Sequence, residues 1–422
     1  MKAIWSIAVV CLLMIVGQSC VQRKPDTAMN EKKKSNVTAK DILGNPYYQA
    51  ISFGGYREKT REVQPTIEQL KEDLKILHAM GIRIVRTYNV HLPHASNVVR
   101  AIHELTTADP SFEMYVMLGA WIDCKNAWTD QAPDHFAESE RNEKEMATAI
   151  ALANQYPDII KILAVGNEAM VKWAESYYVQ PSVILKWVTH AQQLKSEGKL
   201  NKDLWITSSD DFASWGGGDS IYHTKDLENL IKAVDYISMH TYPYHNTHYN
   251  PAFWRVPKNE QPLTEIEKVN TAMVRAQKFA KSQYDSVVNY MKSLGIDKPV
   301  HIGETGWATT SDGFYGAEGS RATDEYKQGL YYKHMRDWTN KAGITCFYFE
   351  AFDEQWKDAA NPNGSENHFG LFTLDGKAKY PLWDMVDQKV FDGLTRDGNP
   401  ITKSFDGNKK SLLQVVKAPP TE

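Results

Sequence analysis

The strongest constraint on the fold of this chain is an eightfold alternation of short apolar runs with helix-like stretches. The eight runs span residues 51–56, 82–89, 114–123, 159–169, 204–210, 236–244, 300–308 and 344–352. Helical patterns lie between them, among others at 66–80, 138–156, 182–197 and 323–342. Parallel strands need crossover helices, and closing the sheet into a cylinder removes its edges. The pattern therefore predicts an α/β fold, a (β/α)8 TIM barrel.

A doubly wound open sheet is the alternative arrangement of the same elements. It is disfavoured because no Gly-x-Gly-x-x-Gly turn follows the first predicted strand. We expect one barrel domain over residues 42–405 and a peripheral C-terminal tail over residues 406–422. The segments 245–267 and 353–372 follow the sixth and eighth strands. Connections of this length tend to be functional, so we expect both to form cleft walls.

The N-terminus has the pattern of a processing signal. Lys2 precedes an apolar run over residues 4–16 that ends in Gly17-Gln18-Ser19-Cys20. The run is too short to span a bilayer and is typical of a secretory signal. A cysteine after small residues resembles a bacterial lipobox. We therefore predict a signal peptide over residues 1–19, lipidation of Cys20, a flexible tether over residues 20–41 and a lipid-anchored location at a bacterial cell envelope, on the outer-membrane or periplasmic face. Simple secretion is the alternative.

The charge balance and the cysteines exclude several classes of protein. The 48 Lys and Arg residues against 52 Asp and Glu residues leave no basic excess for nucleic-acid binding. Apart from Cys11 and Cys20, only Cys124 and Cys346 occur, and spacing leaves open whether they pair. No CxxC or HExxH spacing is present. We therefore predict no metal site. We also expect the protein to be a monomer.

Two glutamates are candidates for the chemistry. The carboxyl ends of barrel strands carry the active site of this fold, and Glu168 and Glu304 each follow an apolar run and a glycine close to such an end. A buried glutamate is costly unless it is paired or functional. Two of them on different strands suggest the facing acid/base pair that glycosidic bond cleavage needs. For either residue alone, a salt-bridged carboxylate at the barrel rim is the competing interpretation.

Motifs at five strand ends and in the last long loop carry a resemblance to a known family. They are Val85-Arg86-Thr87-Tyr88, Val165-Gly166-Asn167-Glu168, Tyr242-Pro243-Tyr244, Glu304-Thr305-Gly306-Trp307, the stretch from Phe349 to Lys357, and His368-Phe369-Gly370-Leu371-Phe372. Over about residues 51–382 the chain resembles glycoside hydrolase family 17, the retaining β-1,3-glucanase-type enzymes of the large (β/α)8 clan.

The resemblance implies a role for each residue that matches these motifs. Glu168 would be the general acid/base and Glu304 the nucleophile, with their carboxyl groups about 5–5.5 Å apart. Arg86 and His240 would support this pair. The residues implied in substrate binding are Asn167, Tyr88, Tyr242, Trp307, Phe352, Glu354 and Lys357.

Each implied substrate-binding role is specific. Asn167 would bond a sugar hydroxyl, Tyr242 would donate to the nucleophile and Tyr88 would line the cleft floor. The aromatic rings would stack on sugar. For the pair formed by Glu354 and Lys357, a purely structural salt bridge is the alternative.

The chain departs from the family pattern at several positions. His240 stands where Asn is common, Glu350 where Ala is common, Gly303 and Thr305 where Ser is common, and Ala308 where Pro is common. None of these changes removes a catalytic carboxylate. Five further tryptophans in or beside the predicted rim loops are candidates for sugar contact: Trp121, Trp128, Trp215, Trp254 and Trp356.

The resemblance implies a retaining hydrolase of β-1,3-glucan of the laminarin type, endo-acting and without a cofactor. Its partners would be a β-glucan polysaccharide or oligosaccharide and, through the lipid anchor, a membrane. A β-1,3-glucan transglycosylase and an exo-acting β-1,3-glucanase are alternatives with the same chemistry. A non-catalytic glycan-binding lipoprotein is the alternative without chemistry.

Overall fold

A computed structural model of the protein describes residues 37–421. The predicted signal peptide, Cys20 and most of the predicted tether lie outside the described residues. The described part forms one compact unit that begins at Val37. Some segments outside the predicted strands and helices also form short helices and hairpins.

The eight predicted strands form a closed barrel. In barrel order, neighbouring strands are β1, β10, β9, β8, β7, β6, β3 and β2, and each neighbouring pair is parallel. Their bounds are β1 Gln49–Ser52, β2 Ile82–Arg86, β3 Tyr115–Ala120, β6 Ile160–Asn167, β7 Trp205–Asp211, β8 Ile237–His240, β9 Val300–Gly306 and β10 Cys346–Phe349. The prediction of a TIM barrel is confirmed.

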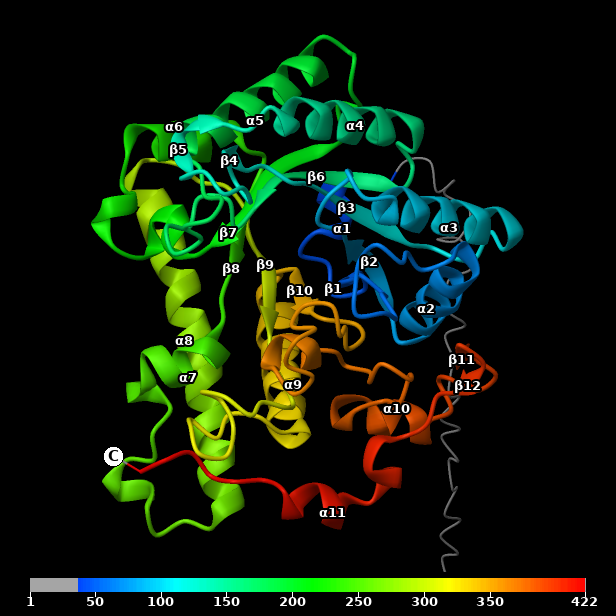
Figure 1. Ribbon diagram of the computed structural model, residues 1–422, viewed down its shortest axis with the longest axis vertical. Helices are drawn as coiled ribbons and strands as arrows, with labels where there is room; N and C mark the ends of the chain where they lie inside the picture. The colour runs from blue at the N-terminus through cyan, green and yellow to red at the C-terminus, as the bar shows by residue number, and fades with distance from the viewer. Residues whose placement is uncertain (1–36, 422) are drawn as a thin grey trace, which may run out of the picture. The chain divides into compact units, whose positions relative to one another are not determined.

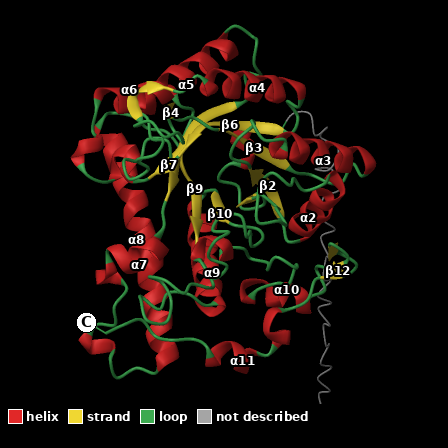
Figure 2. Cartoon of the chain, in the orientation of Figure 1, coloured by secondary structure: helices red, strands yellow, loops and turns green. Residues whose placement is uncertain are grey.

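Helices cover the outside of the barrel (Figures 1 and 2). They are α2 Ile67–Ala79, α3 His94–Ala108, α4 Arg141–Gln155, α5 Pro181–Ser196, α6 Lys225–Ala233, α8 Glu265–Ser293 and α9 Glu325–Ala342. The four helical stretches named from the sequence are α2, α4, α5 and α9. Local signals set their starts: the Thr66 side chain accepts a hydrogen bond from the Gln69 amide, and the Asp324 carboxylate accepts one from the Lys327 amide.

A short helix, α1 (Ala39–Ile42), closes the N-terminal mouth of the barrel. Ala39 and Ile42 are fully buried and belong to the same apolar cluster as Ala50 and Ile84 of the first two strands. Thr38 and Asp41 cap this helix reciprocally. The expectation that the tether runs to residue 41 is therefore wrong for residues 39–41, because they form a helix whose Ala39 and Ile42 side chains pack into the barrel interior.

The two long segments that follow β8 and β10 contain short helices. The first contains α7 (Pro243–Tyr249), η5 (Pro251–Phe253) and η6 (Lys258–Glu260), and the second contains η7 (Ser365–His368). A hairpin that the pattern did not predict, β4 (Cys124–Lys125) with β5 (Asp134–Glu138), follows β3. After β7 come η3 (Ala213–Gly217) and η4 (Ser220–Tyr222).

The C-terminal part packs against the barrel domain. It contains η8 (Tyr380–Leu382), α10 (Trp383–Asp387), the hairpin β11 (Thr395–Arg396) with β12 (Asn399–Pro400), η9 (Ser404–Gly407) and α11 (Lys409–Gln414). Figure 1 shows this red segment passing below α9 to the region of α7. Leu412 is fully buried, and the Val256 amide donates to the Pro420 carbonyl at 2.9 Å. The described part of the predicted tail therefore belongs to the folded unit.

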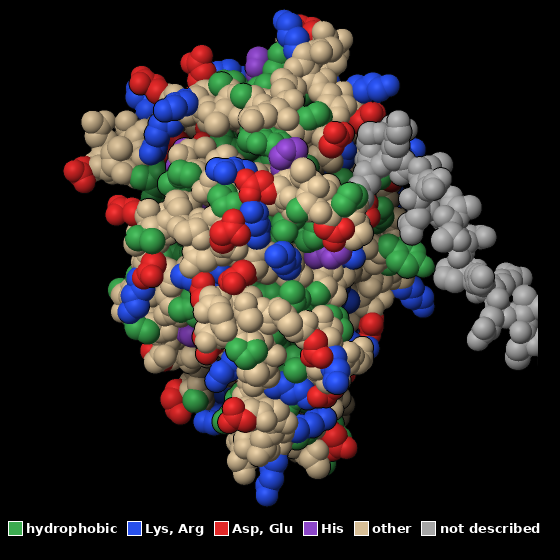
Figure 3. Space-filling model, turned by 90° about the vertical axis from the view of Figure 1, so that its right-hand side faces the viewer, with side chains coloured by type: hydrophobic (Ala, Val, Ile, Leu, Met, Phe, Trp, Pro, Cys, Tyr) green, Lys and Arg blue, Asp and Glu red, His purple; other side chains and the backbone are tan. Residues whose placement is uncertain are grey.

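Cys124 and Cys346 are both buried and free, so the two thiols do not pair. Within residues 37–421, no helix combines the length and the apolar character that crossing a bilayer requires. Figure 3 shows Lys and Arg side chains interspersed with Asp and Glu side chains over one face of the protein. This mixture fits the balanced composition and is unlike a surface built for a polyanion.

Candidate active site

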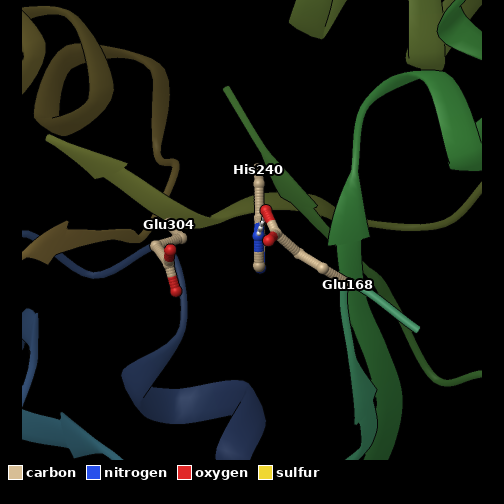
Figure 4. A group of neighbouring side chains, drawn as sticks. All are labelled: Glu168, His240 and Glu304. Atoms are coloured by element: carbon tan, nitrogen blue, oxygen red, sulfur yellow. Dashed lines mark hydrogen bonds and ion pairs between the residues drawn. The ribbon is translucent and has the colours of Figure 1, made fainter. Parts of the chain in front are cut away.

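Glu168 and Glu304 face each other at the C-terminal mouth of the barrel. Glu168 directly follows β6, where its backbone adopts a φ of 45°, and Glu304 lies near the end of β9. One oxygen from each carboxylate and one ring nitrogen of His240 all lie within 4.8 Å of one another (Figure 4). Carboxyl groups about 5–5.5 Å apart are typical of retaining glycosidases, whereas inverting enzymes need a wider gap for a water molecule.

Three side chains hold the Glu304 carboxylate. Arg86, from the end of β2, donates to Oε2 at 2.8 Å, and the Tyr88 hydroxyl donates to the same oxygen at 2.7 Å. The Tyr242 hydroxyl donates to Oε1 at 2.6 Å. The family resemblance implied the contact of Tyr242 with the nucleophile, and Tyr88, expected to line the cleft floor, makes the same kind of contact. These contacts orient the carboxylate and leave it acceptor-only.

The environment of Glu304 favours its charged form. Burial by itself would raise the pKa of this carboxyl, but nearby His240 and Arg86 and the two phenol donors outweigh burial and hold the pKa below its ordinary value. Of the two possible cations, Arg86 is the one that acts at neutral pH, because burial lowers the pKa of His240 to about 4. Glu304 is therefore ionised, as a nucleophile must be.

The environment of Glu168 favours the protonated form. Burial is the main cause, the charge of Glu304 is the second, and together they raise the pKa of Glu168 to about 8 against the opposing effect of Arg86. Two neighbouring carboxyls with pKa values pushed apart are the arrangement in which one serves as acid and the other as nucleophile. The assignment implied by the family resemblance thus has an electrostatic basis in this chain.

His240 connects Glu168 to a short chain of hydroxyl groups. Its Nδ1 lies 3.0 Å from Glu168 Oε1, and its Nε2 lies 2.8 Å from Ser209 Oγ. Ser209 Oγ in turn lies 2.9 Å from Ser238 Oγ. His240 is fully buried and neutral at pH 7, so only one of its nitrogens carries a proton. When the serine donates to Nε2, Nδ1–H donates to Glu168.

Gly303 makes room for this chain of hydroxyls. A Cβ at this position would collide with the hydroxyl oxygens of Ser238 and Ser209. The family departure to glycine at 303 and the departure to histidine at 240 therefore belong together. The sequence marked both positions as unusual, but only the structure shows that they share one hydrogen-bonded group.

Asn167, the residue before the acid, lies between the acid and Arg86. Its Oδ1 accepts a hydrogen bond from Arg86 Nη2 at 2.5 Å. Arg86 therefore positions both the amide of Asn167 and the carboxylate of Glu304. This fixes the orientation of the Asn167 side chain at the mouth, where it was predicted to meet a sugar hydroxyl.

Two of the predicted sugar platforms are not available to a ligand. Trp307 is 0% exposed, and its indole N–H donates to the Ala322 carbonyl at 2.8 Å. Phe352 is 1% exposed and stacks on Phe372 with ring centroids 5.1 Å apart. The prediction that these two rings stack on sugar is wrong, because the segments that follow β9 and β10 fold over them.

The five further tryptophans that were candidates for sugar contact differ in exposure. Trp215 and Trp254 are fully buried and cannot touch sugar. Trp121 and Trp356 are partly exposed, and Trp128 is exposed.

Glu354 and Lys357 have largely structural contacts. Glu354 Oε1 accepts from the Tyr56 amide at 3.1 Å, and Oε2 accepts from the Trp356 indole at 2.7 Å. Lys357 Nζ lies 3.7 Å from Glu354 Oε2 but pairs more closely with Glu350. The structural alternative for Glu354 is therefore the one that its contacts support. The Glu350–Lys357 pair was not predicted, although Glu350 was noted as a departure from the family.

Within residues 37–421, one group of side chains has a spacing that would suit a metal ion. It consists of Glu168, His240 and Glu304. Arg86 already lies 2.8 Å from Glu304, and a second cation would be repelled by it. Both nitrogens of His240 are also engaged. The donor set fits an acid/base pair better than a metal site.

Comparisons with known proteins agree with this geometry. The family described as BtgE/BtgC glycoside hydrolase domain matches residues 50–370. A solved structure of an endo-laminarinase from Formosa Hel1_33_131 is 66% identical, with a TM-score of 0.91 over 92% of this chain and 98% of that one.

More distant relatives show the same family and fold. A probable glucan endo-1,3-β-glucosidase, btgC, of Aspergillus flavus is 23% identical over 84% of this chain and 46% of its own length. The chain thus spans about half the length of the curated relatives it matches. A Rhizomucor miehei β-1,3-glucanosyltransferase, at 21% identity with a TM-score of 0.55 over 79% of this chain and 96% of that one, shares the fold. The chain belongs to the BtgE/BtgC glycoside hydrolase domain family, a group of β-1,3-glucanases of the family 17 type.

Proposed function

We propose that this protein is a retaining, endo-acting hydrolase of laminarin-type β-1,3-glucan. The observation that carries the proposal is the pair formed by Glu168 and Glu304, whose oxygens lie within 4.8 Å of each other and whose pKa values are shifted in opposite directions. The proposal is supported by the 66% identity to a protein described as an endo-laminarinase.

In the first step, ionised Glu304 attacks the anomeric carbon while protonated Glu168 donates its proton to the departing glycosidic oxygen. The bond between carbon and leaving oxygen breaks, and an ester bond to Glu304 forms. Arg86, Tyr88 and Tyr242 keep the attacking carboxylate in place by the hydrogen bonds described above.

In the second step, Glu168 acts as the base. Once Glu304 is esterified its charge is gone, so the charge that helped to hold the proton on Glu168 is gone too. The ionised Glu168 takes a proton from water, the water oxygen attacks the anomeric carbon, and the ester breaks. Nδ1–H of His240 donates to the carboxylate that exists between the two steps.

The test is the purified protein on laminarin and on a panel of β-1,3-, β-1,6- and mixed-linkage glucans, with product lengths followed over time. We expect mixed short oligosaccharides from laminarin at early times and a loss of several orders of magnitude in the Glu304→Gln variant. Glucose alone as the early product would assign an exo-acting enzyme. Products longer than the starting oligosaccharide would assign a transglycosylase.

We also propose that the protein acts as a monomer attached to a bacterial envelope through lipidated Cys20. The proposal is supported by the basic and apolar residues before Gly17-Gln18-Ser19-Cys20. Expression in a bacterial host with an alkyne-labelled fatty acid should label the full-length chain in the membrane fraction. The Cys20→Ala variant should lose the label, and labelling that persists would refute the anchor. Light scattering of the released domain tests the monomer.

A further inference from the structure

Asp210 is a buried carboxyl group beside the catalytic pair that the mechanism above does not use. It lies near the end of β7, the strand next to β6, and it is 0% exposed. A carboxyl group at this depth is costly unless the protein gives it partners or a task. Burial is the main reason that the pKa of Asp210 is raised to about 7, and the charge of Glu168 acts in the same direction. Asp210 is therefore close enough to the acid to interact with it.

The turn that carries Glu168 has an unfavourable backbone. Gly166 adopts a φ of 86° and Glu168 a φ of 45°. A left-handed backbone is easy for glycine, but it costs about 1–2 kcal/mol for a residue with a Cβ. Such a residue keeps this conformation only where its surroundings hold it there. The position of the acid thus depends on the contacts that hold this turn.

Strand β7 holds the turn at two points. The Glu168 amide donates to the Ser209 carbonyl at 2.9 Å, and the Met170 amide donates to Asp210 Oδ2 at 2.7 Å. The first bond joins backbone groups, so any residue at 209 can accept it. The second bond needs an acceptor atom on the side chain at 210. Met170 is 2% exposed, so its amide would be buried and unpaired without this acceptor.

The other carboxylate oxygen fixes the orientation of Asp210 itself. Its Oδ1 accepts a hydrogen bond from the Asp211 amide at 2.9 Å. The Asp211 side chain is held in turn, because its Oδ1 accepts from the Ala213 amide at 2.8 Å, at the start of η3. Backbone amides thus engage both oxygens of Asp210. The carboxylate is kept aimed at the Met170 amide, which is the orientation that the turn requires.

We propose that Asp210 is a positioning residue for the general acid/base, and that it acts through the Met170 amide to hold the turn in which Glu168 faces the leaving oxygen. Asp210 does not touch the reacting atoms and takes no part in proton transfer. Without its carboxylate the turn relaxes toward a backbone that glutamate prefers, and the Glu168 carboxyl moves. Glu304, on β9, keeps its own three donors. The inference rests on the proposed function for the role of Glu168.

The experiment separates the acid from the nucleophile by the leaving group. Phenyl β-laminaritrioside and 2,4-dinitrophenyl β-laminaritrioside share one sugar chain. Phenolate needs a proton to depart and dinitrophenolate does not, so kcat/KM depends on the acid for the first substrate only. Asp210→Ala should lower kcat/KM about a hundredfold for the phenyl substrate and less than about threefold for the dinitrophenyl substrate. Asp210→Asn keeps an oxygen acceptor for the Met170 amide, so it should lose less than about tenfold on the phenyl substrate.

Asp235→Ala is the matched control. Asp235 Oδ2 also accepts a backbone amide at 2.7 Å, that of Ile206, but at the opposite end of β7. The control should cleave both substrates as the native protein does. If Asp210→Ala does not fold, Asp210→Leu is measured with the same expectations, because leucine fills the space without an acceptor.

A loss of the same size on both substrates in Asp210→Ala, or full activity on both, would overturn the inference. So would an Asp210→Asn variant as impaired as Asp210→Ala on the phenyl substrate. These outcomes leave the proposed function standing, because the native protein still cleaves laminarin. A native protein that cleaves neither laminarin nor the dinitrophenyl substrate would reject the proposed function and this inference with it.

Discussion

The charge of Glu304 should control the proton on Glu168, and the Glu304→Gln variant removes that charge without changing the shape of the side chain. The two carboxylates have oxygens within 4.8 Å of each other. At an effective dielectric constant of about 20, two unit charges at this distance interact by about 3.5 kcal/mol, which corresponds to about 2.5 pKa units.

Burial is the larger cause of the raised pKa of Glu168, and burial stays in the variant. We therefore expect the pKa of Glu168 to fall from about 8 to about 5.5 and to remain above that of an ordinary glutamate. The active native protein should lose kcat/KM as the pH rises through about 8, because Glu168 then loses its proton. On the acid side, activity should fall only below the ordinary glutamate range, where Glu304 becomes protonated.

The pKa of Glu168 is measured by carbon-13 NMR titration of protein labelled at the glutamate carboxyl carbons. The Glu168→Gln variant assigns the signal. Glu366→Gln is the control, because Glu366 is the smallest of the named causes that raise the pKa of Glu168. A Glu168 pKa that moves by less than half a unit in Glu304→Gln would refute the coupling and leave burial as the whole explanation.

Three further substitutions test other parts of the structure. His240→Leu removes the hydrogen-bond donor to Glu168, so the pKa of Glu168 should rise, the alkaline limb of the pH profile should move to higher pH, and kcat should fall about tenfold. An unchanged profile would show that the histidine only fills space. Gly303→Ala puts a methyl group against Ser238 and should cost about 1–3 kcal/mol in urea unfolding. Asp73→Ala, on the outer helix α2, removes the ion-pair partner of buried Arg396 and one of the two partners of Arg57, and should cost about 3–5 kcal/mol of stability while kcat/KM stays unchanged.

The positions of the two carboxylates were predictable because strand ends in a parallel barrel meet at one mouth. Glu168 and Glu304 each follow an apolar run, and a run that forms a barrel strand places its last residues at the site. The contact between Tyr242 and Glu304 was implied by the family resemblance. By contrast, the contact between His240 and Glu168 depends on how β8 and β6 lie relative to each other through β7, which no local pattern encodes.

The exposure of aromatic side chains was the least predictable property of the chain. Trp307 and Trp128 both lie near the barrel rim, yet one is 0% exposed and the other 57%. The Ala322 carbonyl, from a later part of the chain, accepts a hydrogen bond from the first, whereas the second lies at the surface and stacks on Tyr177. The sequence around Trp307 does not distinguish it from Trp128, so the residues that pack against each ring in the folded protein decide whether the ring is buried or exposed.

Reading along the chain is enough to obtain the barrel, the two candidate glutamates and the mouth at which they lie. These follow from periodicity and strand polarity, which are local properties repeated eight times in one direction. Which glutamate is the acid and which the nucleophile was implied by the family resemblance. The pKa values and the burial of Trp307 and Phe352 depend on distances between residues that are far apart in the chain. Charge interactions and desolvation act through space, and therefore only the folded protein sets them.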